Sequence, residues 1–185
     1  MRKIALIGLA MFLFASWASA QVPTSGNVFF GYSFENSDST TLNVNGNRTN
    51  LQGWEASLEG KLLPWVGIVA DLSGHYGSEN FAEITPDGPL NLNVSAHELE
   101  VLFGPRVSVS VGKFRPFAEA EVGVGHVNTN NFGSDTSIAT ALGGGIDYKI
   151  MRLLAWRLQG DYIGTRFYGT TQSDFRLSTG IVVHF

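Results

Sequence analysis

Near the end of the chain, the sequence reads Leu154-Ala155-Trp156-Arg157-Leu158-Gln159-Gly160-Asp161-Tyr162. In an extended strand, successive side chains point to opposite faces. One face here carries Leu154, Trp156, Leu158 and Tyr162, and the other carries Arg157, Gln159 and Asp161. This period of two predicts a β-strand with one apolar face and one charged face.

The same alternation recurs in seven other segments. Their apolar rows are Val28, Phe30, Tyr32 and Phe34; Trp54, Ala56, Leu58 and Leu62; Val66, Ile68, Ala70 and Leu72; Leu99, Val101 and Phe103; Ala118, Ala120, Val122 and Val124; Ile138, Leu142, Ile146 and Tyr148; and Leu177, Thr179, Ile181, Val183 and Phe185. The sequence therefore predicts an all-β chain of eight strands.

The predicted connections alternate between long and short. The long ones cover residues 36–50, 78–96, 128–136 and 168–174, and the short ones lie at Leu63-Pro64, Val111-Gly112-Lys113 and Ile150-Met151-Arg152. Tight turns join antiparallel neighbours, so the pattern indicates an antiparallel up-and-down barrel. Short turns at one end and long loops at the other are typical of an outer-membrane barrel.

The composition excludes several classes of protein. The chain has 185 residues, 22 glycines, no cysteine, 15% charged residues and a net charge of −4. A hydrophobic fraction of 44% argues against disorder, and the negative charge argues against a nucleic-acid binder. Without cysteine, no disulfide framework and no thiolate metal site can form.

The first twenty residues predict a cleaved secretory signal peptide. Arg2 and Lys3 form a basic start, residues 4–14 are apolar, and Ala18-Ser19-Ala20 is a small-residue cleavage site. The apolar run is shorter than the roughly 20 residues that a spanning helix needs. We expect a single barrel domain over residues 21–185, and an uncleaved anchor is the alternative.

Periodicity alone does not say which face points outward, because a soluble barrel such as a lipocalin alternates with the faces exchanged. The polar rows are dominated by Gly, Ser, Ala and short acids, which suit a narrow lumen. Lys61, Lys113 and Lys149 lie at or near the short turns. Aromatic residues fall at the ends of the apolar rows, as in interfacial girdles: Trp65, Phe117, Tyr148, Trp156 and Phe185 near the short turns, and Phe34, Tyr76 and Phe167 near the long loops. A membrane-spanning barrel is favoured over a soluble barrel or a sandwich.

Several motifs resemble a known family. They are Val28-Phe29-Phe30-Gly31-Tyr32-Ser33-Phe34, Asp71-Leu72-Ser73-Gly74-His75-Tyr76-Gly77, Leu102-Phe103-Gly104-Pro105-Arg106, Gly143-Gly144-Gly145-Ile146-Asp147-Tyr148 and the ending Arg176-Leu177-Ser178-Thr179-Gly180-Ile181-Val182-Val183-His184-Phe185. Together they resemble the outer-membrane β-barrel domain family of the OmpA/OmpX type, over essentially the whole mature chain.

This resemblance implies a protein of the Gram-negative outer membrane with both termini periplasmic. The chain stops at the eighth predicted strand, so the peptidoglycan-binding domain of OmpA-type proteins is not expected. The terminal Phe185 is similar to the signal that the barrel-assembly machinery reads. The expected partners are outer-membrane lipids, that machinery and an unknown surface ligand, and no nucleic acid.

The inward rows predict a polar network inside the lumen. Its members are Glu55, Asp71, Arg106, Glu119, Glu121, Asp147, Arg157, Asp161 and Arg176, with Glu59, Glu98 and Glu100 in the same rows. We expect the guanidinium groups to bridge carboxylates on adjacent strands, which would give the network a structural role. A narrow cation-selective path is the sharper alternative, although eight strands leave an interior that side chains just fill.

No catalytic site is expected. Asp71, Ser73 and His75 share one face of a strand, but alternate residues lie about 6.6 Å apart, which is too far for a nucleophile and its base. Partners on neighbouring strands could still complete such a site. His97 and His126 show no metal-ligand pairing, and the acids of the long loops, Glu79, Glu83, Asp87 and Asp135, lack calcium-loop spacing. The triple glycine precedes no helix, so we expect close strand approach there and no cofactor.

From these features we expect a small non-enzymatic barrel with an envelope-integrity or adhesion role carried by its long external loops. The alternatives are a low-conductance cation-selective, porin-like pore and, less favoured, a lipid-modifying enzyme that would need an outward-facing His and Ser.

Overall fold

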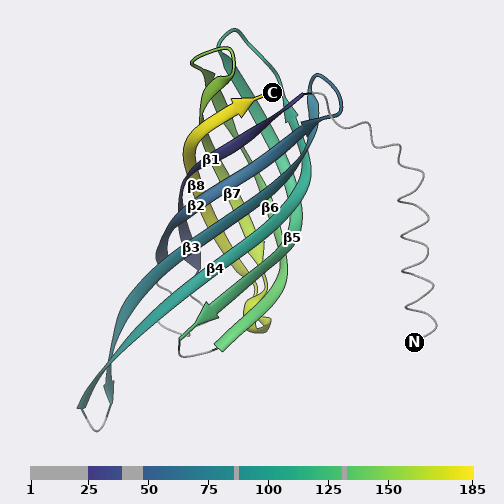
Figure 1. Cartoon of the computed structure of the whole chain (residues 1–185). Coiled ribbons are helices and arrows are strands. Elements are labelled where there is room, and N and C mark those ends of the chain that lie inside the picture. The colour runs from purple at the N-terminus through teal and green to yellow at the C-terminus, as the bar shows by residue number, and fades with distance from the viewer. Residues whose placement is uncertain (1–24, 39–47, 86–87, 131–132) are drawn as a thin grey trace, which may run out of the picture.

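The computed structural model describes residues 25–38, 48–85, 88–130 and 133–185, and leaves the side chains of residues 38, 79–85, 88–94 and 168 undescribed. The chain forms one closed barrel of tilted strands (Figure 1). The predicted signal peptide, residues 1–20, lies outside the described residues. None of the helices in the described ranges is long and apolar enough to span a membrane.

Eight antiparallel strands make the barrel, as predicted. They are β1 (Gly26–Asp38), β2 (Arg48–Lys61), β3 (Val66–Thr85), β4 (Gly88–Ser108), β5 (Phe114–Thr129), β6 (Gly133–Lys149), β7 (Leu154–Thr165) and β8 (Gln172–His184), with a short 3₁₀ helix, η2 (Phe167–Gly169), before β8. Each strand pairs with the next, and β1 pairs with β8 to close the sheet, for example at Phe30 and Ile181. Because closure pairs both edges, no strand edge remains along the wall of the barrel.

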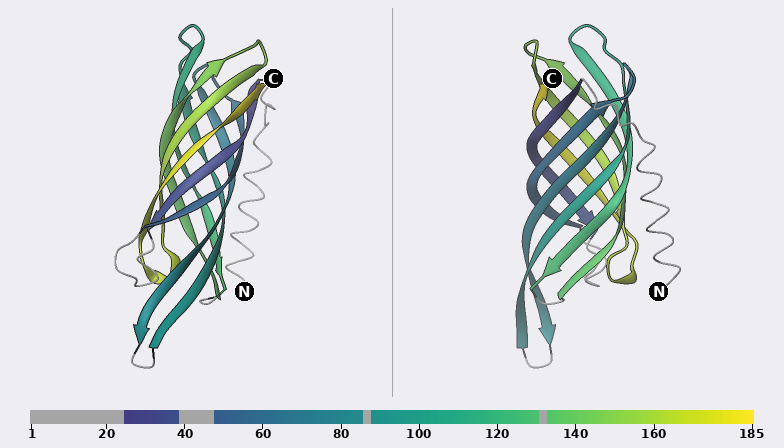
Figure 2. Two further views of the ribbon diagram at one scale, coloured as in Figure 1. Left: turned by 90° about the vertical axis from the view of Figure 1, so that its left-hand side faces the viewer. Right: turned by 45° about the vertical axis from the view of Figure 1, so that its right-hand side comes forward.

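The predicted short turns all lie at one end of the barrel. Three tight connections follow β2, β4 and β6, and the β4–β5 turn contains Gly112 at a φ of +63°, a conformation that glycine adopts without strain. Phe185 lies at the same end, where its backbone exchanges hydrogen bonds of 3.0 and 3.1 Å with Gly26. Both ends of the described chain therefore meet beside the short turns (Figure 2).

The opposite end corrects the prediction of a long loop over residues 78–96. The structure continues β3 and β4 as a paired hairpin, from Ser78 opposite Ser95 to Thr85 opposite Gly88. Its backbone extends well beyond the other strands (Figures 1 and 2). The stretch Leu90-Asn91-Leu92-Asn93-Val94 keeps the period of two, which is the signal that the loop assignment overlooked.

The other long connections are shorter than predicted or lie outside the described residues. β5 ends at Thr129 and β6 begins at Gly133, so strand pairing takes up most of the predicted loop over residues 128–136. η2 and the start of β8 occupy the fourth predicted loop. Residues 39–47 of the first are not described.

The two faces of the wall differ as predicted. Large apolar side chains cover the outside, including Ile138 at 70% exposed, Leu142 at 68% and Phe30 at 64%. Charged and hydroxyl side chains fill the inside. The apolar rows therefore point away from the lumen on every strand for which they were predicted.

Two aromatic residues depart from the predicted girdles. Phe117 is 7% exposed and Phe167 is 2% exposed, so both lie inside, and Phe29 on β1 is fully buried as well. Trp65, Tyr76, Trp156 and Phe185 do lie on the outer surface near the ends of the barrel. The position of Phe117 follows from its parity, since it alternates with the outward Ala118 and is in step with the inward Glu119.

The triple glycine of β6 makes room for the inward Phe117 ring. This agrees with the close approach of strands that we expect from the sequence. A Cβ atom at Gly145 would lie 2.8 Å from Phe117 Cζ and 2.9 Å from Gln159 Cα. Gly160 on the neighbouring β7 has no such constraint, because a Cβ there would meet only the Phe175 ring, at 3.6 Å or more, and the Arg176 carbonyl oxygen at 4.0 Å. Gly145 is therefore required by lumen packing.

We expect Gly145→Ala to destabilise the barrel by about 1–3 kcal/mol, the usual cost of overpacking. The readout is the denaturant midpoint at which the faster-migrating folded band is lost on an unboiled gel. The matched variant Gly160→Ala should keep the wild-type midpoint. Equal midpoints for the two variants would show that the 2.8 Å approach does not constrain the fold.

Candidate functional site: the barrel lumen

The lumen concentrates nearly all the buried charge of the described residues. Eleven carboxylates and three guanidinium groups are buried there: Glu35, Glu55, Glu59, Asp71, Glu98, Glu100, Glu119, Glu121, Asp147, Asp161 and Asp174, with Arg106, Arg157 and Arg176. All nine residues named for the polar network from the sequence are in this set. Acids thus outnumber arginines, and each arginine contacts more than one group.

Arg106 and its partners lie nearest the short turns. Its Nε donates to Glu119 Oε2 at 2.6 Å, and its Nη1 lies 3.6 Å from Glu59 Oε2. Glu59 also forms ion pairs with Lys61 and, at 3.5 Å, with Arg115. The Glu59 carboxylate is therefore shared among three cations, which offsets the cost of burying it.

Arg157 forms the second cluster. It donates two parallel hydrogen bonds to Asp147, of 2.6 and 2.9 Å, in the bidentate geometry that suits a guanidinium fork. Its Cζ lies 4.5 Å from the Phe117 ring centroid and 5.1 Å from that of Phe29. Arg106 Cζ also lies 4.5 Å from the Phe117 centroid, so one inward ring contacts two cations.

Arg176 bridges four strands across the lumen. Its guanidinium donates at 3.0 Å to Asp161 on β7 and to Asp71 on β3, and at 2.9 Å to Ser73. It also lies 3.4 Å from Glu55 on β2 and 3.6 Å from Glu100 on β4. Of these four strands only β7 is next to β8, so the contacts span the interior as well as joining neighbours.

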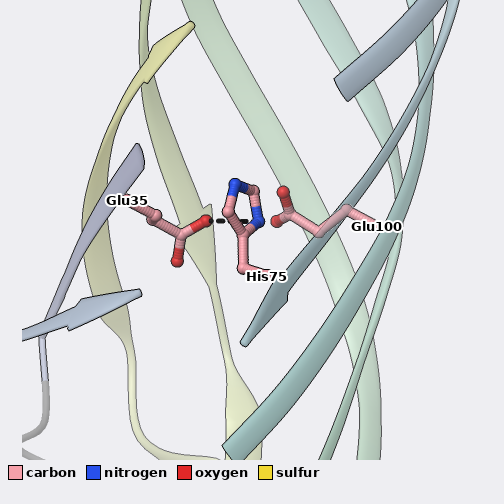
Figure 3. Close-up of side chains that lie close together, drawn as sticks. All are labelled: Glu35, His75 and Glu100. Carbon is pink, nitrogen blue, oxygen red and sulfur yellow. Dashed lines mark ion pairs between the residues drawn. The ribbon is translucent and has the colours of Figure 1, made fainter. Parts of the chain in front are cut away.

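A third group gathers around His75, and the sequence reading missed its partners. His75 Nε2 lies 2.8 Å from Ser33 Oγ, and Nδ1 lies 3.1 Å from Glu35 Oε2. Ser73, which was considered with His75, instead contacts Glu100 and Arg176. Figure 3 shows the Glu35 and Glu100 carboxylates on either side of the imidazole in that view.

The order Ser33, His75 and Glu35 matches a nucleophile, a base and an orienting acid. Chemistry also needs access, and each of these residues is at most 1% exposed. A substrate carbonyl has no path to Ser33 Oγ without rearrangement of the lumen. Ser33 and Glu35 alternate inward on β1, but β2 separates that strand from β3, so sequence spacing carried no sign of the contact with His75.

The mouth at the short-turn end is basic. A pocket there is lined by Lys113, Arg115, Lys149, Arg152 and His184, together with Asp147 and four other residues. Most of the acids expected at the opposite end, Glu79, Glu83 and Asp87, lie outside the described side chains. His126 is exposed and contacts Thr136 Oγ1 at 2.7 Å, and His97 packs edge-on against Tyr76.

Comparison with known proteins finds similarity in structure alone. No protein-family model matches the chain, and no curated protein matches its sequence. The crystal structure of Neisserial surface protein A (NspA) matches with a TM-score of 0.66 at 12% identity, over 86% of this chain and 97% of that one. The crystal structure of Ail, the attachment invasion locus protein of Yersinia pestis, in complex with the heparin analogue sucrose octasulfate, matches with a TM-score of 0.56 at 14% identity, over 87% of this chain and 98% of that one.

At these identities the similarity concerns the fold. Both matches span nearly the whole of the solved chains, so no further domain of theirs is left uncovered. The eight-stranded architecture that the sequence motifs suggested is therefore confirmed, and the chain has the fold of the eight-stranded outer-membrane β-barrels.

Proposed function

We propose that the chain is an integral outer-membrane protein with a non-enzymatic role in surface interaction or envelope integrity, carried by its external end. The observation that supports this most strongly is the contrast between a lumen filled with paired charges and the β3–β4 hairpin, which projects beyond the wall. A filled lumen leaves the external segments as the place for a specific contact.

The outer surface supports a position in the membrane. Side chains such as Phe30, Phe103 and Leu142 are 64%, 58% and 68% exposed on a wall with no other apolar cover among the described residues. Lipid tails are the partner that suits such a continuous apolar band. Both termini then lie on the periplasmic side with the short turns, and the exposed Phe185 ring is available to the barrel-assembly machinery.

The long-loop end then faces outward from the cell. The hairpin gives this end a paired backbone in place of the predicted loop, which suits contact with another surface. The structural neighbours whose names refer to the cell surface and to attachment, NspA and Ail, are consistent with an adhesive role, which we propose for this chain.

A narrow cation-selective pore is the second candidate, and the excess of eleven buried acids over three buried arginines favours it. Against it, Arg106, Arg157 and Arg176 are fully buried, each linked to carboxylates on other strands. Water and ions would have to displace these ion pairs in order to pass.

We expect planar-bilayer recordings of the refolded mature chain to show no steady conductance steps, because the paired side chains fill the lumen. Only samples whose boiled and unboiled forms migrate differently on a gel should be used. The double variant Glu119→Gln/Glu121→Gln should be equally silent. Cation-selective steps in the wild type that disappear in this double variant would support the pore and contradict the proposal.

We expect shortening of the hairpin to abolish attachment while leaving the barrel intact. Ser78 pairs with Ser95, so residues 79–94 can be replaced by a two-residue Asn-Gly turn without changing the register. Cells displaying this variant should attach at least about tenfold less than wild-type cells to a heparin-coated surface, the polyanion whose analogue is bound in the Ail structure.

The matched control replaces the β4–β5 turn at the opposite end, residues 109–113, with another short turn, which should leave attachment unchanged. Gel mobility of the unboiled samples checks that both variants fold. Undiminished attachment by the hairpin variant, or loss of attachment in the turn control, would exclude the hairpin as the contact surface.

A further inference from the structure

Three buried side chains in the lumen bring metal-ligand atoms together. Glu35 on β1, His75 on β3 and Glu100 on β4 each direct one ligand atom into a space where these atoms lie within 4.8 Å of one another (Figure 3). All three are at most 1% exposed. The group lies next to the last paired rung of β2 and β3, Gln52 with Tyr76, so it occupies the root of the projecting hairpin.

The hydrogen bonds around His75 leave one nitrogen for a ligand. Ser178 Oγ lies 2.5 Å from Glu55 Oε2 and 2.9 Å from Ser33 Oγ. The Ser178 hydroxyl has only one proton to donate. Donation to the Glu55 carboxylate gives the stronger, charge-assisted hydrogen bond. If Ser178 gives its proton to Glu55, Ser33 can donate to Ser178 and accept from His75 Nε2–H.

In this arrangement His75 Nδ1 carries a lone pair directed at a carboxylate. Nδ1 and both oxygens of Glu35 have no hydrogen-bond partner, although they are buried, and Nδ1 lies 3.1 Å from Glu35 Oε2. Two acceptors that face each other in a buried site need either a shared proton or a cation between them. A metal-bound histidine usually has this pattern, in which the other ring nitrogen donates to a neighbour.

The surrounding charge favours a cation. The negative charges of Glu98, Glu100 and Asp174 act on the Glu35 carboxylate, opposed by the positive charge of Arg176. Arg176 is the register neighbour of Glu35 on β8 and lies 3.6 Å from Glu100 Oε2, but its hydrogen bonds go to Asp71, Ser73 and Asp161. Glu98, opposite His75 in register, is buried with an unpartnered Oε1 and can supply a further oxygen.

We propose that Glu35, His75 and Glu100 bind one divalent transition-metal ion, with Zn²⁺ as the reference ion. One imidazole and two carboxylates form a ligand set that zinc accepts. Zinc bonds of about 2.0–2.2 Å place ligand atoms about 3.3–4.2 Å apart, so side-chain shifts of about 1 Å close the site. The bound ion links β1 to β3 and β4 at the root of the hairpin.

The test measures zinc retained by the refolded barrel after one equivalent of ZnCl₂ is added and the sample is dialysed. We expect about one Zn²⁺ per folded chain, with affinity at least about tenfold lower in His75→Gln and in Glu35→Gln. The matched control is the triple variant His97→Gln/His126→Gln/His184→Gln. It removes every other histidine of the chain and should keep the wild-type affinity.

Wild-type barrel that retains no zinc would overturn the proposal, and so would a triple variant that loses binding. These two measurements do not require the lumen variants to fold. Where His75→Gln or Glu35→Gln does fold, as judged by gel mobility, unchanged affinity would also overturn it. The imidazole signature in X-ray absorption at the zinc edge should correspond to one histidine, and a signature of two or more would contradict the assignment.

Discussion

The burial of charged side chains inside a closed eight-stranded wall is the constraint on which the rest of this structure depends. A barrel of this size has an interior that side chains must fill, and here the filling is charged because the apolar residues point outward. Removing one partner of a buried ion pair costs about 3–5 kcal/mol, because the other charge is left buried without a partner. The charged residues of the lumen therefore depend on one another. Arg176 shows this best, since its one guanidinium joins carboxylates from β7 and β3 and lies near those of β2 and β4.

The same constraint explains the unusual residue choices on the wall. Phe117 points inward by its parity on β5, two guanidinium groups lie over its ring, and Gly145 leaves space for it. Neither would be expected of a strand whose outer face contacts an apolar medium and whose inner face contacts water. Three arginines cannot pair with every oxygen of eleven buried acids, and buried carboxylate oxygens without a hydrogen-bond partner include those of Glu35, Glu98 and Glu121.

Much of the fold could be read from the sequence, because period two and turn chemistry are local signals. The alternation from Leu154 to Tyr162 predicts both the strand β7 and which of its faces is apolar. The short turn at Gly112 lies where the sequence predicts it. The hairpin was missed because polar Asn residues in residues 90–94 outweighed an alternation that was present. Phe117 was misplaced because its aromatic character was given more weight than its parity.

The candidate site could be predicted only as a set of inward residues. Which acid meets which arginine depends on the curvature of the closed sheet, and no spacing in the chain encodes that. Ser33 and His75 are 42 positions apart on strands that do not pair, yet their side chains are 2.8 Å apart. The cluster at the hairpin root therefore becomes visible only when the barrel is closed.

Single-cysteine labelling in lipid vesicles distinguishes a sealed polar lumen from a water-filled one, since the chain has no cysteine of its own. Ser178→Cys, Leu177→Cys and Arg152→Cys place the thiol inside the lumen, on the outer wall and at a turn, respectively. We predict that a water-soluble maleimide labels only the turn position, and that a lipid-soluble maleimide also labels position 177. Rapid labelling at position 178 by the water-soluble reagent would mean a water-filled lumen and would contradict the account.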